Sequence, residues 1–381
     1  MIQRRNKAIL TGVFALIVWV CGVNYSHAAT PAKFNFIVSG DTINPKVDSE
    51  GVNVLQSICD QIRGMSISPK LFLIPGDIGA VSLLKEYMGS LYDITFPIRG
   101  NHDTAVDYDQ SLRWTPAEIK ARVKAIGGKN YSTLPQEEGL TYSFDYQNAH
   151  FVGLDSISKT TMNLTAAQLD WLDKDLEAAE KRILTHAFIQ THVPLIGCSR
   201  DYVTGVPSYL IPIINKHKII SLWLGGHTHV FAWTHINKQR VSGLTNEVES
   251  FNVGPLSQGG RSGPWILDGT YDYGDTNKKY GFAVIKVDGL SVTVEWYNRE
   301  NTALIWSKTF IPRGNFQTGD VKNSDHVINS YDALLVARHA AGQITLTYNE
   351  LVRGDVNYDR KITKDDADLI TQYVVGLISK F

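Results

Sequence analysis

The chain lacks two features that would restrict its function at once: an excess of basic charge and a dense framework of cysteines. Its net charge is −1, and it has only three cysteines in 381 residues. Without a basic excess, we expect no nucleic acid partner. A hydrophobic content of 43% and a charged content of 20% are typical of a globular protein, here long enough for one large and one small domain.

The N-terminus predicts a secretory signal peptide. Basic residues at positions 4, 5 and 7 precede an apolar run, 8–23, and the small-residue site Ser26-His27-Ala28 follows; signal peptides show this order of regions. We expect cleavage of residues 1–28, which leaves a secreted, extracellular protein with no membrane segment. An uncleaved anchor is the alternative, since a membrane span needs about 18 apolar residues.

Cys59 and Cys198 remain in the mature chain. Outside the cytosol they could form a disulfide, but no spacing motif supports the pair, and two separate buried thiols are an equal alternative. No cysteine falls within the polar motifs described below, so a thiolate metal site is not indicated.

Strand-like and helix-like segments alternate from about Lys33 to about Pro312. Short continuous apolar runs are typical of buried parallel strands, and paired runs around a short turn predict hairpins. The expected strands are 34–38, 71–74, 94–98, 141–146, 150–154, 187–189, 219–224, 281–287 and 291–297, and the expected helices are 52–62, 82–91, 115–125 and 165–181. This pattern predicts an α/β fold with added antiparallel strands.

Five of the strand-like runs end in a polar motif. Open α/β sheets place ligand sites just beyond the carboxyl ends of their strands, and carboxylate, amide and imidazole groups bind hard or borderline divalent ions. Two such ions activate water and stabilise the attacking and leaving oxygens of a displacement. We therefore expect a two-metal centre with the ligands Asp41, Asp77, Asn101, His192, His227 and His229.

Two residues beside the ligand Asn101 predict the acid of the reaction. His102 is placed to face the leaving oxygen as a general acid or oxyanion stabiliser, and Asp103 to orient its imidazole through the other ring nitrogen. Arg99 and Asp155 also lie near the motifs. A surface salt bridge is the preferred interpretation of these two, which stay outside the predicted site.

In this order the motifs resemble those of calcineurin-like metallophosphoesterases: Asp-x-His, Gly-Asp, Gly-Asn-His-Asp/Glu, His and Gly-His-x-His. The similarity covers about residues 33–312 and includes segments without ligands, 142–146, 150–155 and 168–172. The resemblance implies a four-layer αββα sandwich and makes His102 the catalytic histidine. It also implies one metal on Asp41, Asp77 and His229, and a second on Asp77, Asn101, His192 and His227.

One position departs from the family pattern. Ile43 stands where the first motif has its His, and its side chain cannot bind a metal. Purple acid phosphatases also lack this His but supply a Tyr three residues after the Gly-Asp aspartate, where this chain has Ala80. We expect the ion on the Asp41 side to be bound more weakly than its neighbour. A degenerate fold that binds a ligand without turnover is the alternative.

After a short linker, 313–318, the segment 319–381 repeats itself. Gly319-Asp320-Val321 returns as Gly354-Asp355-Val356, each followed by an acidic loop and an apolar helix, 331–341 and 364–375, and internal repeats indicate a separate module. The second loop has the spacing of an EF-hand, and the first fits after one inserted residue. The predicted calcium ligands are Asp320, Asn323, Asp325 and Asp332 in the first loop, and Asp355, Asn357, Asp359, Lys361 (through its carbonyl) and Asp366 in the second.

The paired loops resemble a type I dockerin, the module that attaches cellulosomal enzymes to the cohesins of a scaffoldin. In dockerins, loop positions 10 and 11 help to select the cohesin. Here these are Ser330 and Tyr331, then Lys364 and Asp365. The two pairs differ chemically, so the symmetric binding of some dockerins is in doubt. Because so small a module has little core, we expect two Ca²⁺ ions to contribute much of its folding energy. A calcium-stabilised tail without a partner is the alternative.

These features together predict a secreted, cellulosome-associated dimetal phosphoesterase that hydrolyses a phosphomonoester or phosphodiester with a metal-activated hydroxide. The ligand types permit Mn, Fe or Zn. One rival is a phosphodiesterase restricted to nucleotides or phospholipids. The other is a catalytically degenerate binding module on the same scaffold.

Overall fold

The computed structural model describes the chain from residue 32 to its end, with gaps. The described ranges are 32–42, 53–79, 81–103, 115–135, 141–155, 163–196, 206–257, 272–274, 280–299, 301–311, 317–322 and 326–381. The predicted signal peptide, most of the predicted linker, Ile43, Ala80, Cys198, Asn323 and Asp325 lie outside them, so the predictions about these residues remain predictions.

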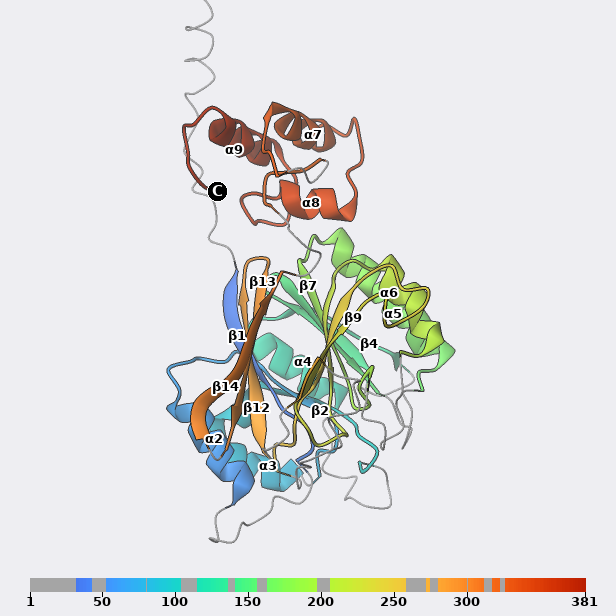
Figure 1. The fold of residues 1–381 in the computed structure, drawn as a ribbon, viewed down its shortest axis with the longest axis vertical. Coiled ribbons are helices and arrows are strands. Elements are labelled where there is room, and N and C mark those ends of the chain that lie inside the picture. The colour runs from blue at the N-terminus through green and yellow to red at the C-terminus, as the bar shows by residue number, and fades with distance from the viewer. Residues whose placement is uncertain are drawn as a thin grey trace, which may run out of the picture.

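The larger domain contains two β-sheets that pack face to face (Figure 1). In the first sheet, three parallel strands continue into three antiparallel strands in the order β14-β13-β12-β1-β2-β3. The strands are β1 (Lys33–Val38), β2 (Phe72–Pro75), β3 (Thr95–Ile98), β12 (Gly281–Asp288), β13 (Ser291–Asn298) and β14 (Asn301–Phe310).

The second sheet has the order β11-β9-β10-β8-β7-β6-β5-β4. Its central strands β6, β7, β8 and β10 are parallel, and the outer strands pair antiparallel. The strands are β4 (Lys129–Thr133), β5 (Tyr142–Tyr146), β6 (Ala149–Leu154), β7 (His186–Thr191), β8 (Ile220–Gly225), β9 (Ala232–Ile236), β10 (Val248–Asn252) and β11 (Tyr273–Gly274).

Helices cover the outer faces of both sheets, which confirms the four-layer αββα sandwich. The helices α2 (Val54–Gly64) and α3 (Val81–Met88), with the 3₁₀ turn Gly89–Ile94, lie over the first sheet. The helices α5 (Ala166–Lys181) and α6 (Ile211–Lys216), with the 3₁₀ turn Ser208–Leu210, lie over the second. Helix α4 (Pro116–Ala125) packs beside the edge strand β4. One apolar core fills the space between the sheets, and another lies under α5 and α6.

Local signals explain why α5 begins and packs where it was predicted. Thr165 and Gln168 form a capping box, in which the Thr165 side chain accepts from Gln168 N and the Gln168 side chain accepts from Thr165 N. Such a cap satisfies backbone groups that the first helical turn leaves unpaired. Leu172 and Leu176 then fall on one face and are fully buried. On α2, Cys59 is a buried free thiol, and burial raises its pKa to about 12.

A buried ionic network joins the β5–β6 hairpin to α5. His150 Nδ1 lies 2.7 Å from Asp145 Oδ1, and His150 Nε2 lies 2.8 Å from Asp175 Oδ2. Arg182, at the end of α5, donates to Asp145 with both Nε and Nη2, at 2.7 and 3.0 Å. Burial alone would lower the pKa of His150, but the two carboxylates outweigh it and raise that pKa to about 9. His150 is therefore a buried cation at neutral pH.

Arg99 and Asp155 do form a salt bridge, but the prediction that it lies at the surface was wrong. Asp155 is 1% exposed and the Arg99 side chain 17% exposed, and Arg99 Nε donates to Asp155 Oδ1 at 3.1 Å. The pair joins the residue after β3 to the residue after β6. Its burial comes from the packing of the two sheets, which a local sequence pattern does not encode.

The C-terminal module is all-helical and has its own small core. It contains α7 (Ser330–Ala340), α8 (Tyr348–Gly354) and α9 (Lys364–Val374), and its core includes Val321, Val336, Val356 and Ile370. Helices α7 and α9 match the predicted helices, whereas α8 was not predicted. Among the described residues, none of the helices combines the length and hydrophobicity that a membrane crossing requires.

The His150 network generates a stability prediction. We expect His150→Gln to lower the free energy of unfolding by about 3 kcal/mol at pH 6, because two buried carboxylates lose their cation. The folded pKa, about 9, lies above the usual value of about 6.5. The stabilisation is therefore complete below about pH 6.5 and is lost as the pH rises through 9. Urea unfolding of both proteins at pH 6 and pH 9.5 measures the difference in their free energies of unfolding. This difference should be smaller at pH 9.5.

His235→Gln is the matched control. The His235 side chain also contacts two carboxylates, but it is 32% exposed, so we expect a change of at most about 1 kcal/mol. If the difference in free energy of unfolding between wild type and His150→Gln stays constant with pH, the assignment of a buried charge to His150 is contradicted.

Candidate metal centre

The predicted ligands converge because they follow parallel strands of both sheets. Asp41, Asp77 and Asn101 come after β1, β2 and β3, and the three histidines come after β7 and β8. Backbone hydrogen bonds tie these loops together: Asp41 N donates to Gly76 O at 3.1 Å, and Gly226 N donates to His192 O at 2.8 Å. The ends of both sheets therefore build one site.

The side chains meet at ligand-like distances. One potential ligand atom from each of Asp41, Asp77 and His192 lies within 4.8 Å of the others. Asn101 Oδ1 is 2.8 Å from His192 Nε2 and 2.9 Å from His227 Nδ1. His229 Nε2 lies 3.6 Å from Asp41 Oδ1. All six residues predicted as transition-metal ligands are thus brought together, although their role as ligands remains a prediction.

His192 is held in a neutral form whose Nε2 can bind a metal. Its Nδ1–H donates to the carbonyl oxygen of Pro75 at 2.8 Å, and complete burial lowers its pKa to about 4. Nε2 therefore carries a lone pair at neutral pH, and it faces Asn101 Oδ1 and Asp77 Oδ1, which carry lone pairs too. Three facing lone pairs repel one another, and a cation among them removes that repulsion.

Asp77 provides a second test of whether a metal fits. Its Oδ1 accepts a hydrogen bond from His102 N at 3.0 Å, while its buried Oδ2 has no hydrogen-bond partner. Burial raises the pKa of this carboxyl, although the nearby histidines oppose the rise. A buried oxygen without a partner is costly in a folded protein. A divalent ion satisfies this oxygen and the neighbouring nitrogen donors, so the residues fit the predicted centre.

Four of the predicted ligands have a backbone that non-glycine residues rarely adopt. Asp41, Asp77, His227 and His229 have φ angles of 58°, 53°, 66° and 55°. Such left-handed residues cost on the order of 1–3 kcal/mol each and cluster at functional sites. These left-handed residues lie just beyond the strands, where the ligand loops begin.

The glycines of the motifs are part of the site, and the sequence analysis did not single them out. A Cβ on Gly76 would lie 2.4 Å from His192 Nδ1, and one on Gly100 would lie 2.2 Å from Asp77 Oδ1. A Cβ on Gly226 would lie 2.7 Å from Pro75 O. Their recurrence directly before the ligands was the available signal.

Asp103 has a role that was not predicted. Its carboxylate accepts from the backbone N–H groups of Ile78, Gly79 and Gly100 at 2.7–3.2 Å. It therefore joins the loops that follow β2 and β3. Burial and the charge of Asp77 raise its pKa, whereas the backbone hydrogen bonds oppose the rise. His102 is exposed beside the buried ligands, and its orientation by Asp103 stays a prediction.

The described parts of the two predicted calcium loops share one geometry. The first aspartate of each loop accepts from the backbone N–H at loop position 6, with the inserted residue of the first loop discounted: His326 donates to Asp320 at 3.0 Å and Arg360 to Asp355 at 2.9 Å. Oδ1 of both aspartates is buried without a hydrogen-bond partner. Burial and neighbouring carboxylates raise the pKa of Asp355 to about 7. Buried carboxylate oxygens without hydrogen-bond partners are suited to bind a cation.

The last predicted ligand of each loop also caps the following helix. Asp332 accepts from Val321 N at 2.9 Å and from Asn329 N at 2.9 Å. Asp366 makes the corresponding contacts with Val356 N and Thr363 N, at 3.1 and 2.9 Å. Loop closure and helix initiation therefore depend on the same carboxylate.

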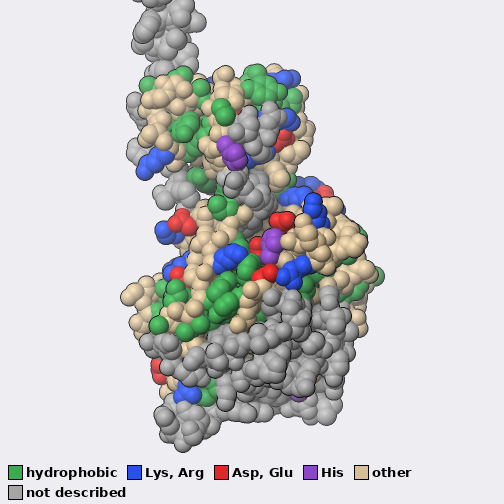
Figure 2. Space-filling view, viewed as in Figure 1, with side chains coloured by type: hydrophobic (Ala, Val, Ile, Leu, Met, Phe, Trp, Pro, Cys, Tyr) green, Lys and Arg blue, Asp and Glu red, His purple; other side chains and the backbone are tan. Residues whose placement is uncertain are grey.

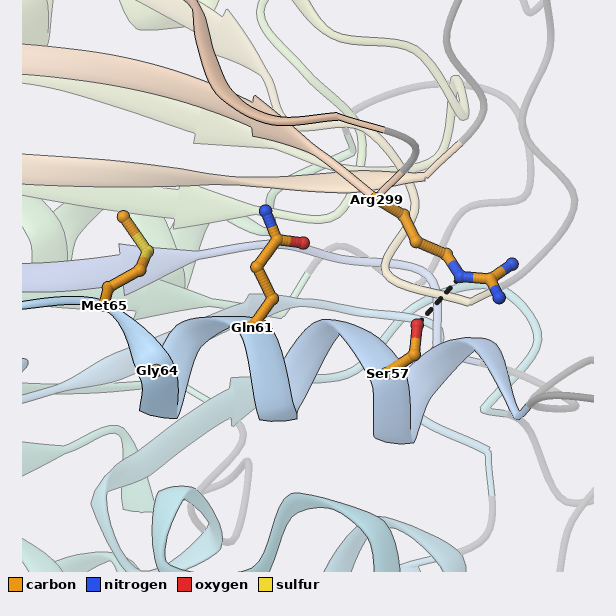
Figure 3. A pocket seen from close by; sticks show the side chains of 5 residues that line it. All are labelled: Ser57, Gln61, Gly64, Met65 and Arg299. Carbon is orange, nitrogen blue, oxygen red and sulfur yellow. Dashed lines mark hydrogen bonds between the residues drawn. The ribbon is translucent and has the colours of Figure 1, made fainter.

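A separate surface pocket of about 610 Å³ lies between α2 and the end of β13 (Figure 3). Arg299 Nε donates to Ser57 Oγ across it at 2.8 Å. Its lining residues are Ser57, Gln61, Gly64, Met65 and Arg299. None of these is a predicted site residue, so the pocket is distinct from the candidate metal centre.

The close approach of Gly100 to Asp77 generates a prediction. We expect Gly100→Ala to lower metal affinity at least about tenfold, because the added methyl group displaces the Asp77 carboxylate. Metal analysis after dialysis against a fixed concentration of Mn²⁺ or Zn²⁺ measures the loss. Gly64→Ala is the matched control, since a Cβ there has nothing within 4 Å. Equal metal content in the two variants would count against the placement of Asp77.

Comparison with solved structures shows a shared fold. A purple acid phosphatase, PPD1, from yellow lupin seeds aligns with a TM-score of 0.51 and 16% identity, over 73% of this chain and 54% of that chain. A PhoD structure (TM-score 0.49, 12% identity, 75% and 71% coverage) and a dimetal phosphatase from Danio rerio (0.44, 12%, 74% and 99%) also match. The chain thus covers about half of the lupin protein. A comparison with curated proteins finds no match.

Two family models match the sequence, and they cover both modules. The calcineurin-like phosphoesterase model matches residues 34–231, which include all six converging residues. The type I dockerin model matches residues 318–375, which include both acidic loops and the helices between and after them. The chain therefore belongs to the calcineurin-like phosphoesterases and carries a C-terminal type I dockerin domain.

Proposed function

We propose that the chain is a secreted, metal-dependent phosphoric ester hydrolase that a cohesin holds on an extracellular, cellulosome-type scaffold. One observation carries the hydrolase proposal: carboxylates, an amide and imidazoles converge at the strand ends, around the unpartnered oxygen of Asp77. Such a donor set suits two Mn, Fe or Zn ions and a phosphomonoester or phosphodiester substrate.

The residues of the site have different roles in the proposed reaction. When bound, the two ions activate water as the nucleophile and stabilise the negative charge of the phosphoryl group. Asp41, Asp77 and His229 would hold one ion, and Asp77, Asn101, His192 and His227 the other. Pro75 fixes the tautomer and ring orientation of His192 through the hydrogen bond to Nδ1, as outer partners of metal-bound histidines do.

His102 is placed to assist the leaving group. It follows Asn101 directly, its backbone N–H donates to Asp77, and its side chain is exposed. A proton donated from its imidazole to the leaving oxygen allows the alcohol to depart neutral. Asp103 holds the adjoining loops together, so that His102 and the ligands keep a fixed spacing.

The dockerin gives the second half of the proposal. The outer part of this module carries hydrophobic side chains (Figure 2). On the first repeat, Val327, Tyr331 and Leu334 are 56%, 49% and 49% exposed. Tyr331 and Leu334 share a face of α7 through their i, i+3 spacing, and Val327 lies three residues before that helix. Lys361, Asp365 and Asp368 occupy the corresponding positions of the second repeat. A cohesin that recognises the apolar face therefore binds through the first repeat in one orientation.

Metal removal and Asn101→Ala test the hydrolase. We expect chelation to abolish hydrolysis of p-nitrophenyl phosphate or bis(p-nitrophenyl) phosphate, and Mn²⁺ or Zn²⁺ to restore it. Loss of the Asn101 ligand should lower kcat/KM at least about 100-fold and reduce the bound metal. His102→Ala should keep its metal and slow hydrolysis about 10²–10⁴-fold. Wild-type hydrolysis no faster than that of Asn101→Ala would instead favour a degenerate binding module.

The cohesin proposal predicts unequal effects at the same position of the two loops. We expect Tyr331→Ala to raise the Kd for a type I cohesin at least about tenfold, because the ring anchors the apolar face. Asp365→Ala should change the Kd less than about threefold, as exposed rim charges do. Calorimetric titration of the cohesin in the presence of Ca²⁺ measures the Kd of each variant. Chelation of the calcium should abolish cohesin binding. Equal effects, or calcium-independent binding, would count against this arrangement.

A further inference from the structure

Among the described residues, two hydrogen bonds join the dockerin domain to the phosphoesterase domain. Tyr348, the first residue of α8, donates its hydroxyl to Leu184 O at 2.6 Å, and Arg360 Nη1 donates to Gln147 O at 3.1 Å. The Tyr348 side chain also packs against the apolar core that lies under α5 and α6. Figure 1 shows α8 as the dockerin helix that faces the larger domain.

The two acceptor carbonyls belong to one rigid part of the phosphoesterase domain. Gln147 lies in the β5–β6 turn, between Asp145 and His150 of the buried ionic network. Leu184 lies between the end of α5 and the start of β7. Thr185 N donates to Asn148 O at 2.8 Å, which joins the two segments. The acceptors therefore keep a fixed position relative to each other.

Of the two donors, Arg360 belongs to the second calcium loop, and Tyr348 begins the helix that leads into this loop. Arg360 is its sixth residue and adopts a φ angle of 66°, a conformation that favours glycine. Its backbone N–H donates to Asp355 Oδ2 while its guanidinium reaches Gln147. Helix α8 ends at Gly354, directly before Asp355. A cation held by Asp355 would thus order the end of α8 and the backbone of Arg360 together.

The first loop has the same backbone design without the contact. His326 occupies loop position 6 once the inserted residue is discounted, with a φ angle of 63° and a backbone hydrogen bond to Asp320 Oδ2 at 3.0 Å. Within the described part of the chain, its side chain makes no hydrogen bond to the phosphoesterase domain. Arg360 of the second repeat therefore makes a hydrogen bond to the phosphoesterase domain that His326, among the described residues, does not make.

We propose that the second calcium loop and the start of α8 form an intramolecular docking surface for the phosphoesterase domain, and that calcium in this loop strengthens the docking. This inference rests on the calcium-binding part of the proposed function. It assigns the second repeat to a contact within the chain and leaves the apolar face of the first repeat for an external partner.

Tryptophan fluorescence provides a selective test, because all tryptophans that remain after removal of the predicted signal peptide lie before residue 307, outside the dockerin domain. Thermal unfolding followed by this signal reports on the phosphoesterase domain, although calcium binds in the dockerin. We expect calcium to raise the unfolding temperature of the mature wild-type chain by about 3 °C, the shift of a modest stabilisation in a domain of this size. Chelation should reverse the shift.

The variant Arg360→Gly/Tyr348→Phe removes both donors and keeps every predicted calcium ligand. We expect it to bind calcium within about threefold of wild type by calorimetry, since glycine suits the left-handed position, yet to lose the shift in unfolding temperature. His326→Gly is the matched control in the first loop and should retain the shift. A shift that persists in the double variant would show that calcium acts elsewhere and would overturn the proposal.

Small-angle scattering gives a second readout that does not depend on stability. The calcium-loaded wild type and His326→Gly should show a smaller maximum dimension than the double variant, because only the latter releases the dockerin. Equal dimensions would refute the docking. Calorimetry separates the two possible failures: absent calcium binding would refute the calcium part of the proposed function, whereas binding without coupling would refute this inference alone.

Discussion

The rest of the structure depends on one constraint, the burial of two carboxylates against imidazole groups in a space only a few atoms wide. Asp41 and Asp77 are fully buried, and each lies within 4.8 Å of a His192 donor atom. Charges and lone pairs confined in this way repel one another. The left-handed ligands, the glycines without room for a Cβ and the hydrogen bonds of Asp103 all hold the donors in place against that repulsion.

The sequence predicted the fold class, most helices and strands, and the set of residues that meet at the strand ends. These features leave local signals: apolar periodicity, helix caps such as Thr165, and ligand types placed directly after apolar runs. Two features that the sequence did not predict depend on tertiary contacts. The Arg99–Asp155 bridge is buried only because the packed sheets enclose it, and Asp103 bonds to a loop that is distant in sequence. Helix α8 is too short to show a clear period.

The dockerin shows how two repeats with one backbone design acquire different surfaces. Both loops place a non-glycine residue in the left-handed region and use their last aspartate to cap the next helix. These shared features stabilise the loop backbone. The outward side chains can therefore differ between the two repeats. The first repeat carries Val327, Tyr331 and Leu334 where the second carries charged residues. The two repeats therefore share these backbone features and differ in the side chains at their surfaces.

Strand β7 connects the dockerin contact to the candidate metal centre. The residue that accepts from Tyr348, Leu184, lies just before this strand, and His192 of the candidate metal centre lies just after it. The anchored end and the reacting end of the domain are therefore opposite poles of one rigid sheet. In the proposed function, the dockerin would therefore hold the chain at the end of this sheet opposite the candidate metal centre.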